Sequence, residues 1–195
     1  MQLRRYVLTR RPAWALLAAL LVTGCTAQPV AGTPRAVAGT PRAAAFNSTD
    51  IAWIQLMIPM DERARLLTDL APGRAGDPAL ARFAQRAADR RQAELGRLRE
   101  LLARSGAPDA RPHEGHDMPG MVSADTLRGA GALSGEEFDR VFAAALRAHL
   151  TQSVLLCGGE RASGGAGEAR ELAGELEKGG SEELALLDAA RSGKS

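Results

Sequence analysis

Two histidines and two methionines lie close together in one stretch of the sequence. Their spacing, H-x-x-H-x-M-x-x-M, spans nine residues that include two glycines, and glycine lets a loop fold tightly. Imidazole and thioether groups together suit copper, and Cu(I) in particular. We therefore expect a copper-binding loop. Its candidate ligands are His113, His116, Met118 and Met121.

The same stretch allows other interpretations. Glu114 and Asp117 lie among the candidate ligands, and their carboxylates would suit a harder ion. A polar loop can also contain two histidines by chance. The residues alone leave copper, another metal and no metal open.

Two more side chains with ligand chemistry lie in apolar, helical surroundings. His149 falls in an expected helix, where a lone histidine is more often structural or solvent-facing than a ligand. Cys157 ends the apolar run Val154-Leu155-Leu156, which favours the role of a small buried hydrophobe over that of a soft metal ligand.

The sequence lacks the residue patterns of several enzyme classes. It has no Gly-x-Ser-x-Gly elbow, no His-Glu-x-x-His and no P-loop. No histidine has a glutamate three residues before it, as a ferritin-type di-metal oxidase requires. We therefore expect a protein without enzymatic activity.

Four long helices must position the candidate residues, because apolar side chains recur at helical spacing in four segments. The first is expected to start at a cap among residues 47–50, to kink at Pro59 and to end at Pro72-Gly73. The second is expected to start at Asp77-Pro78 and to end at Ser105-Gly106.

The second pair of helices follows a long polar connection over residues 106–133. Ser134 and Glu137 have the spacing of a capping box at the start of the third helix, which should end near Gly158-Gly159. The fourth helix is expected to fray or hinge at Gly179-Gly180, since two glycines cost about 2 kcal/mol of helix propensity.

The two halves of this pattern align at a constant shift of 89 residues without a gap. Trp53 matches Phe142, for example, and Glu94 matches Glu183. The shift predicts an all-α four-helix bundle made from a duplicated helical hairpin with a long crossing loop. Its expected parts are two halves over about residues 46–104 and 134–190, a loop over 105–133 and a tail over 191–195.

The first 45 residues have the features of an exported, lipid-anchored protein. Four arginines and an apolar run precede Leu21-Val22-Thr23-Gly24-Cys25, which resembles the lipobox of bacterial lipoproteins. This interpretation predicts a signal peptide over residues 1–24 and a lipid on Cys25. The alternatives are an ordinary signal peptide with a chance cysteine and an uncleaved anchor. Residues 25–45 lack apolar periodicity and are expected to form a disordered tether.

Charge and cysteine content exclude several classes of protein. The formal net charge is +2 for the whole chain and −2 without residues 1–24, which gives no reason to expect a nucleic-acid partner. Two cysteines are too few for a disulfide-stapled scaffold or a four-cysteine zinc site.

Several short motifs occur in an order that is similar to one known family. They are Phe46-Asn47, Gln55-Leu56-Met57-Ile58-Pro59, Asp77-Pro78, the loop with the histidines and methionines, and Phe138-Asp139-Arg140-Val141-Phe142. The chain resembles the domain-of-unknown-function family 305 over about residues 46–190. The resemblance implies a ferritin-like fold and an exported or membrane-attached protein. Some family members are associated with copper binding and copper tolerance.

The resemblance also implies weaker metal ligands in the helices. The family has a His-His pair after Met-Ile-Pro and a second pair in the third helix. This chain has Met60-Asp61 at the first place and His149-Leu150 at the second, so only one of four helix histidines remains. Met60, Asp61 and His149 are therefore weaker candidates, of which methionine would favour Cu(I) and aspartate a harder ion.

These observations favour a surface-tethered, extracytoplasmic lipoprotein that binds or handles copper through its loop. The alternative is a non-enzymatic helical interaction module in which the metal site has degenerated. The expected partners are a bacterial membrane, through the lipid on Cys25, and a protein that exchanges metal or binds the bundle. The expected location is the outer face of the cell membrane or the periplasm.

Overall fold

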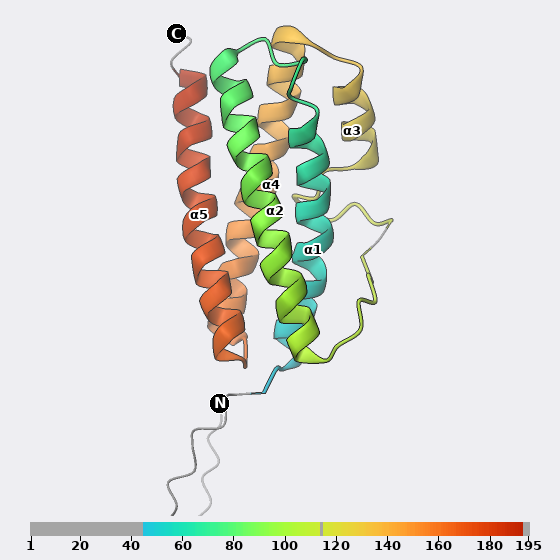
Figure 1. Cartoon of the computed structure of the whole chain (residues 1–195), viewed down its shortest axis with the longest axis vertical. Coiled ribbons are helices and arrows are strands. Elements are labelled where there is room, and N and C mark those ends of the chain that lie inside the picture. The colour runs from blue at the N-terminus through green and yellow to red at the C-terminus, as the bar shows by residue number, and fades with distance from the viewer. Residues whose placement is uncertain (1–44, 114, 193–195) are drawn as a thin grey trace, which may run out of the picture. The chain divides into compact units, whose positions relative to one another are not determined.

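The described part of the chain is an all-α bundle of four long helices and one short one (Figure 1). The computed structural model describes residues 45–113 and 115–192, and these contain no β-strand. Cys25, the expected signal peptide and the expected tether up to residue 44 lie outside the described residues. The helices are α1 (Ser48–Asp69), α2 (Pro78–Ser105), α3 (Ala124–Gly131), α4 (Gly135–Ser163) and α5 (Gly167–Ser192).

Two buried aspartates show how the two hairpins are related. The Asp50 carboxylate on α1 accepts hydrogen bonds from the backbone N–H groups of residues 165–166, just before α5, at 3.0–3.3 Å. The Asp139 carboxylate on α4 accepts from the N–H groups of residues 76–77, just before α2, at 3.0 Å. The two aspartates are 89 residues apart, and so are the two segments that donate to them. Each hairpin therefore binds the start of the second helix of the other hairpin.

The expected starts of α1 and α2 and the expected end of α2 are confirmed, whereas α1 ends at Asp69, ahead of Pro72-Gly73. Asn47 caps α1, because its side chain accepts from the N–H of Asp50 while the Asp50 side chain accepts from the Asn47 N–H. Asp77 caps α2, and Gly106 ends it with a left-handed φ of 71°, which glycine adopts without strain.

Three details expected for the second hairpin are wrong. Ser134 makes no side-chain cap hydrogen bond, and the Gly135 N–H instead donates to the Arg74 carbonyl at 2.7 Å. Helix α4 continues through Gly158-Gly159 to Ser163, and α5 runs unbroken across Gly179-Gly180. Packing outweighs propensity there: a Cβ on Gly180 would lie 3.0 Å from the Val154 side chain of α4, so glycine lets the two helices approach closely.

The core of the bundle has two apolar layers. One layer contains Phe138 and Phe142 of α4, whose rings stack with centroids 5.6 Å apart. The other contains Trp53 and the free thiol of Cys157, which is buried as expected. Along α1 and α2 the polar residues between these layers interrupt the apolar pattern. Those polar residues form one of the two candidate sites described below.

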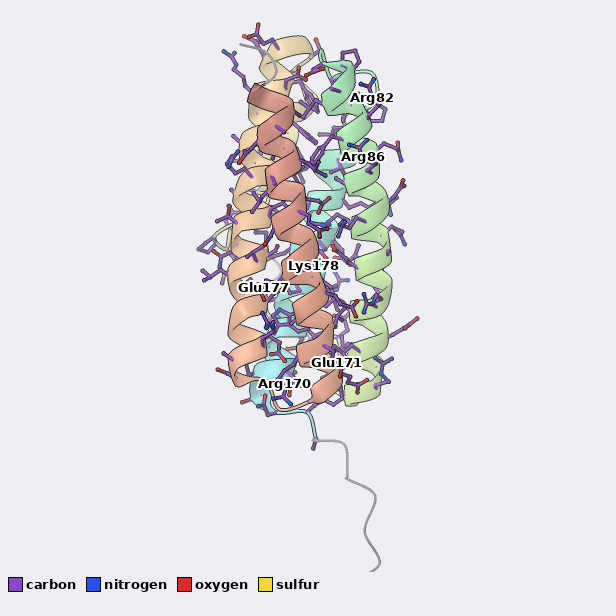
Figure 2. All side chains as sticks on the ribbon, turned by 90° about the vertical axis from the view of Figure 1, so that its left-hand side faces the viewer. Arg82, Arg86, Arg170, Glu171, Glu177 and Lys178 are labelled. Carbon is purple, nitrogen blue, oxygen red and sulfur yellow. The ribbon has the colours of Figure 1, made fainter. Side chains whose placement is uncertain are left out.

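The outer surfaces of α2 and α5 carry charges of both signs (Figure 2). The side chains labelled there are Arg82, Arg86, Arg170, Glu171, Glu177 and Lys178. Helix α4 is long and apolar enough to cross a membrane by length and composition, a test that the core helix of a soluble protein also passes. Its buried side chains, such as Phe138 and Leu146, belong to the core of the bundle.

Candidate functional site

The loop with the expected copper ligands contains two hydrogen-bonded turns. The N–H of His116 donates to the carbonyl of His113 at 3.2 Å, and the N–H of Met121 donates to that of Met118 at 2.9 Å. The third residue of each turn is a glycine, with φ of 83° and 75°. The two histidines therefore lie at the ends of one turn and the two methionines at the ends of the next.

The four expected ligands differ in exposure. His116 is exposed, whereas His113 and Met118 are half-buried. Met121 is only 7% exposed, so its side chain faces the protein. His113 also lines an open, mostly apolar groove of about 790 Å³ between α1 and α4. The structure thus places the two expected histidine ligands in one turn and the two expected methionine ligands in the next. In the described residues, no three His, Cys, Asp or Glu side chains are placed to hold one ion.

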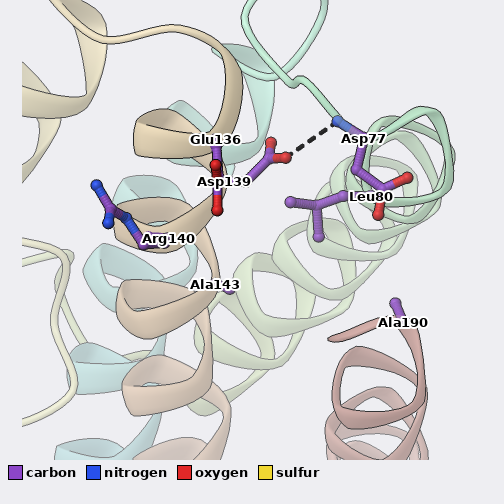
Figure 3. Close-up of a pocket in the computed structure, with 7 residues that line it drawn as sticks. All are labelled: Asp77, Leu80, Glu136, Asp139, Arg140, Ala143 and Ala190. Atoms are coloured by element: carbon purple, nitrogen blue, oxygen red, sulfur yellow. Dashed lines mark hydrogen bonds between the residues drawn. The ribbon is translucent and has the colours of Figure 1, made fainter. Parts of the chain in front are cut away.

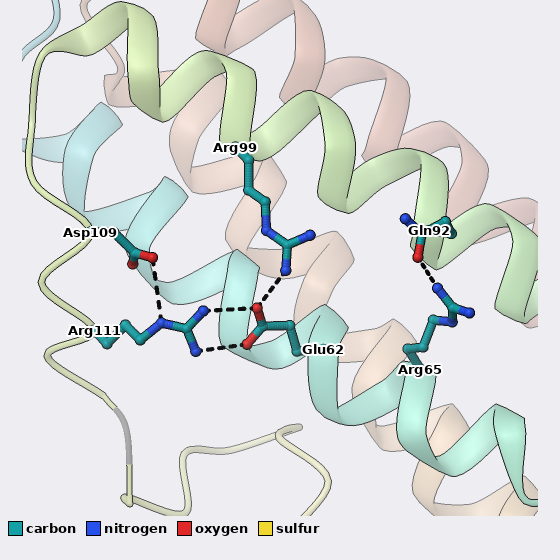
Figure 4. Close-up of polar contacts among 6 residues, drawn as sticks. All are labelled: Glu62, Arg65, Gln92, Arg99, Asp109 and Arg111. Carbon is teal, nitrogen blue, oxygen red and sulfur yellow. Dashed lines mark hydrogen bonds and ion pairs between the residues drawn. The ribbon is translucent and has the colours of Figure 1, made fainter.

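Ion pairs fasten the loop to α1 just before the first histidine (Figure 4). Arg111 binds the Glu62 carboxylate through both terminal nitrogens, at 2.9 and 3.0 Å, and Arg99 of α2 binds it at 2.6 Å. Partial burial opposes the charge of Glu62, but the two guanidinium groups outweigh it and lower the pKa of this carboxyl. The entry to the loop is therefore held between α1 and α2.

The far end of the loop is held by α1 and α4. Arg63 donates to the Val122 carbonyl at 3.3 Å and lies 3.6 Å from the Asp117 carboxylate. Gly120 lies directly on α4, since a Cβ there would be 2.2 Å from the Cβ of Gln152 and 2.9 Å from the carbonyl of Ala148. The segment that carries the histidines and methionines is thus attached at both ends.

The weaker helix candidates lie in the buried centre of the bundle. The imidazole Nε2 of His149 is 3.4 Å from a carboxylate oxygen of Asp61, and both side chains are at least 99% buried. Met60 is also fully buried. The structure therefore brings together a histidine and an aspartate that the repeat does not pair.

Sequence reasoning missed the residue that organises this centre, Arg91. Its guanidinium contacts His149 Nε2 at 3.1 Å, Glu183 at 2.6 Å and Glu94 at 2.8 Å. One signal was available: Arg91 lies four residues before Leu95 on the apolar stripe of α2, a position that faces the core. We call Asp61, Arg91, Glu94, His149 and Glu183 the polar centre.

The charges of the polar centre depend on one another. Burial opposes the charge of Arg91, but the carboxylates of Asp61, Glu94 and Glu183 outweigh it and raise the pKa of Arg91. Burial raises the pKa of Glu94 to about 8, with Arg91 opposing and the other carboxylates adding to the shift. Burial also raises the pKa of Glu183, against the opposing effect of Arg91 and Arg90. One guanidinium thus shares its charge among three carboxyl groups.

A small pocket of about 110 Å³ lies where the starts of α2 and α4 meet the end of α5 (Figure 3). Its polar lining is largely committed to structure, because Asp139 accepts from the N–H of Asp77 and of Gly76. The pocket adds no further candidate ligand set.

Comparison with known proteins identifies the family. The model of the family DUF305, a domain of unknown function, matches residues 50–191. The chain belongs to the DUF305 family. None of the curated proteins matches it.

Solved DUF305 structures have the same fold. A DUF305 protein from Streptomyces coelicolor, assigned as secreted, has a TM-score of 0.64 and 18% identity, over 71% of this chain and 88% of that one. A DUF305 fragment from Deinococcus radiodurans has a TM-score of 0.67 and 17% identity, over 74% of this chain and 96% of the fragment. The helical bundle predicted from the resemblance to this family is therefore confirmed.

Proposed function

We propose that this DUF305 chain is an extracytoplasmic metal-binding protein, without catalytic activity, that holds Cu(I) in the loop from His113 to Met121. The observation that carries the proposal is the pair of consecutive turns, which place two imidazoles at the ends of one turn and two thioethers at the ends of the next. That donor set is soft and suits Cu(I) better than a hard ion.

The state of each donor indicates how an ion would bind. His113, His116 and Met118 are at least partly exposed and accessible from solvent. Met121 is buried, so its thioether would have to rotate out of the protein to join them. The Glu62–Arg111 and Arg63–Asp117 contacts limit the motion of the segment, which reduces the conformational entropy that binding must overcome.

The proposal includes export and a lipid anchor. Support for export comes from the DUF305 protein of Streptomyces coelicolor, which is assigned as secreted. Support for the anchor comes from the sequence around Cys25 alone. A membrane-attached protein with a surface loop could exchange its metal with a protein partner outside the cytoplasm.

A non-enzymatic interaction module is the second candidate, and the groove between α1 and α4 favours it. Leu155 is 67% exposed at this groove, whose lining also includes Leu56 and Trp53. Apolar surface of this kind is found at protein contacts.

A competition titration with a Cu(I) chelator tests the metal proposal. The test variant changes His113, His116 and Met118 to Ala, and we expect its Cu(I) affinity to fall by more than about 100-fold. The matched control is Glu114→Gln, which removes a carboxylate from the same loop but keeps every soft donor. Unchanged affinity in the triple variant, or no Cu(I) binding by the parent chain, would overturn the metal proposal and favour the interaction module.

A further inference from the structure

The polar centre collects metal-ligand side chains from all four long helices. Asp61 comes from α1, Glu94 from α2, His149 from α4 and Glu183 from α5. One imidazole and three carboxyl groups at the centre of a helical bundle resemble, in composition, the donor sets of metal-binding bundles. The difference here is a fifth side chain, Arg91, which lies among them.

Arg91 occupies the place that a cation would take. Its guanidinium contacts three of the four donors within 3.1 Å, and the fourth donor, Asp61, lies 3.4 Å from the His149 ring. The arginine side chain is 3% exposed, so its charge is balanced by these neighbours and not by water. The centre is therefore built around a positive charge.

The guanidinium leaves some polar atoms of the centre without a hydrogen bond. His149 Nε2 lies 3.1 Å from Arg91 Nη1, and the other ring nitrogen, Nδ1, has no hydrogen-bond partner in the described part of the chain. Neither oxygen of the Asp61 carboxylate has a hydrogen-bond partner there either, although this side chain is 99% buried. Unpaired buried groups of this kind are costly, and they point to a ligand of higher charge.

We propose that the polar centre is a divalent-cation site that Arg91 keeps closed, with the guanidinium in place of the metal ion. Without that group, Asp61, Glu94, His149 and Glu183 would form the ligand set. One imidazole with three carboxylates suits ions such as Mn²⁺, Fe²⁺, Co²⁺ or Zn²⁺, in contrast to the soft donors of the loop. Metal ligands bind at about 2.0–2.2 Å. Because these donors surround a whole guanidinium group, they must move inward once the arginine is gone.

The internal repeat supports this role for Arg91. Its equivalent in the second hairpin is Gly180, and α5 is helical through that position. The two glutamates Glu94 and Glu183 are equivalent to each other. Helices α2 and α5 therefore both have a glutamate at this place, although only α2 has a large side chain, Arg91, three residues before it.

The test uses Co²⁺ as the probe and Arg91→Ala in the full chain, with the loop residues His113 and His116 changed to Ala throughout to remove competing ligands. Visible absorption reports the coordination of Co²⁺ by protein ligands. We expect Arg91→Ala to bind one Co²⁺ per chain at least tenfold more tightly than its parent. Adding His149→Ala or Asp61→Asn should abolish that gain.

The matched control is Arg90→Ala. Arg90 is the neighbouring residue and lies 3.6 Å from Glu183, so its removal changes the charge by the same amount while Arg91 stays in place. Equal Co²⁺ binding in the Arg90 and Arg91 variants would overturn the proposal, as would tight binding at the centre of the parent chain.

A variant that fails to fold is covered by a second measurement. Arg91→Met keeps the apolar stem of the side chain, and circular dichroism of both variants is recorded with and without Co²⁺. Metal-dependent recovery of helix supports the proposal. Folded variants that do not bind Co²⁺, or unfolded variants that Co²⁺ does not restore, overturn it. Neither result bears on Cu(I) binding by the loop, which has its own variants and its own probe.

Discussion

Asp50 and Asp139 occupy equivalent positions in the two hairpins and make equivalent hydrogen bonds, yet their surroundings differ. The Asp50 carboxylate lies against the carboxyl of Glu160, whose equivalent in the other hairpin is Ala71. Burial and the nearby Asp50 raise the pKa of Glu160 to about 8. Burial opposes the charge of Asp50, but hydrogen bonds from Glu160 and from backbone N–H groups lower its pKa. The negative charge of this pair thus lies on Asp50, while Glu160 keeps its proton at neutral pH.

The same kind of asymmetry occurs at the polar centre. Asp61 is equivalent to Leu150, and Arg91 is equivalent to Gly180. Each position is charged in one hairpin and uncharged in the other, so the described bundle contains one polar centre and not two. The comparison shows that the repeat preserves the hydrogen bonds of Asp50 and Asp139 to the helix starts, whereas other buried charges differ between the halves. Substitutions that make the halves alike, or that separate their roles, test this view.

The largest effect is expected when Arg91 is replaced by Ala in chelator-treated buffer. Removing one member of a buried charged network leaves the others unpaired, and we expect the free energy of unfolding to fall by about 3–5 kcal/mol. Urea denaturation followed by circular dichroism measures the change. Arg90→Ala, at a half-exposed position, should cost less than about 1 kcal/mol. Similar losses for the two arginines would contradict the special role of Arg91.

The next effect compares the two capping aspartates. Asp139→Ala removes an acceptor for two backbone N–H groups and should cost about 2–3 kcal/mol of unfolding free energy. Asp50→Ala removes the equivalent bonds and also the acceptor of the Glu160 hydrogen bond, so its cost should be larger. Asp125→Ala, at an exposed site, serves as the control in the same urea experiment. A smaller loss for Asp50 than for Asp139 would argue against the hydrogen bond from Glu160.

The pH dependence of stability should reflect Glu160 and Glu94. The folded state raises both pKa values to about 8 from 4.5, so these groups stabilise the fold below about pH 4.5 and lose that contribution as the pH rises to about 8. Each can contribute a slope of up to about 1.4 kcal/mol per pH unit.

Glu160→Gln should therefore flatten the decline in unfolding free energy between pH 5 and pH 8. Glu94→Gln should do the same at the polar centre, and the double variant should be the flattest. Thermal unfolding across this pH range measures the slopes. An unchanged slope in both single variants would show that neither carboxyl holds its proton in the folded state.

The smallest effect is expected at a surface position where the halves also differ. Arg97 forms an exposed ion pair with Glu175, and its equivalent is Leu186, which is 52% exposed. Arg97→Leu should change the free energy of unfolding by less than about 1 kcal/mol, because exposed ion pairs contribute little. Urea denaturation measures this change. A larger loss of unfolding free energy would mean that exposed ion pairs, and not only the buried aspartates, contribute strongly to the contact between the hairpins.

Local signals in the sequence predicted much of the fold. The caps at Asn47 and Asp77 and the stop at Gly106 depend on residues near one another in the chain. The 89-residue repeat is found by comparing the sequence with itself. The predicted break at Gly179-Gly180 failed because the close approach of Val154 from another helix outweighs the low helix propensity of glycine.

The candidate sites were less predictable, for a physical reason. The spacing from His113 to Met121 indicated four soft donors in one loop, and the structure places them at the ends of two turns. The burial of Met121 and the contacts of Arg91 depend on which helices face each other, and short-range spacing does not contain that information. The single sequence-level signal for the polar centre was an arginine on an apolar stripe.

The reciprocal bonds of Asp50 and Asp139 have a consequence for how such a chain can be assembled. An isolated hairpin contains a carboxylate with no amide to bind and a helix start with no carboxylate to hold it. Two copies of one hairpin would satisfy each other, as the subunits of a twofold-symmetric homodimer do. In this chain the connection from residue 106 to residue 134 turns that exchange into a single molecule. Docking of the hairpins is thereby a condition for completing either one, and the two aspartate contacts that join the hairpins do not involve the linking segment.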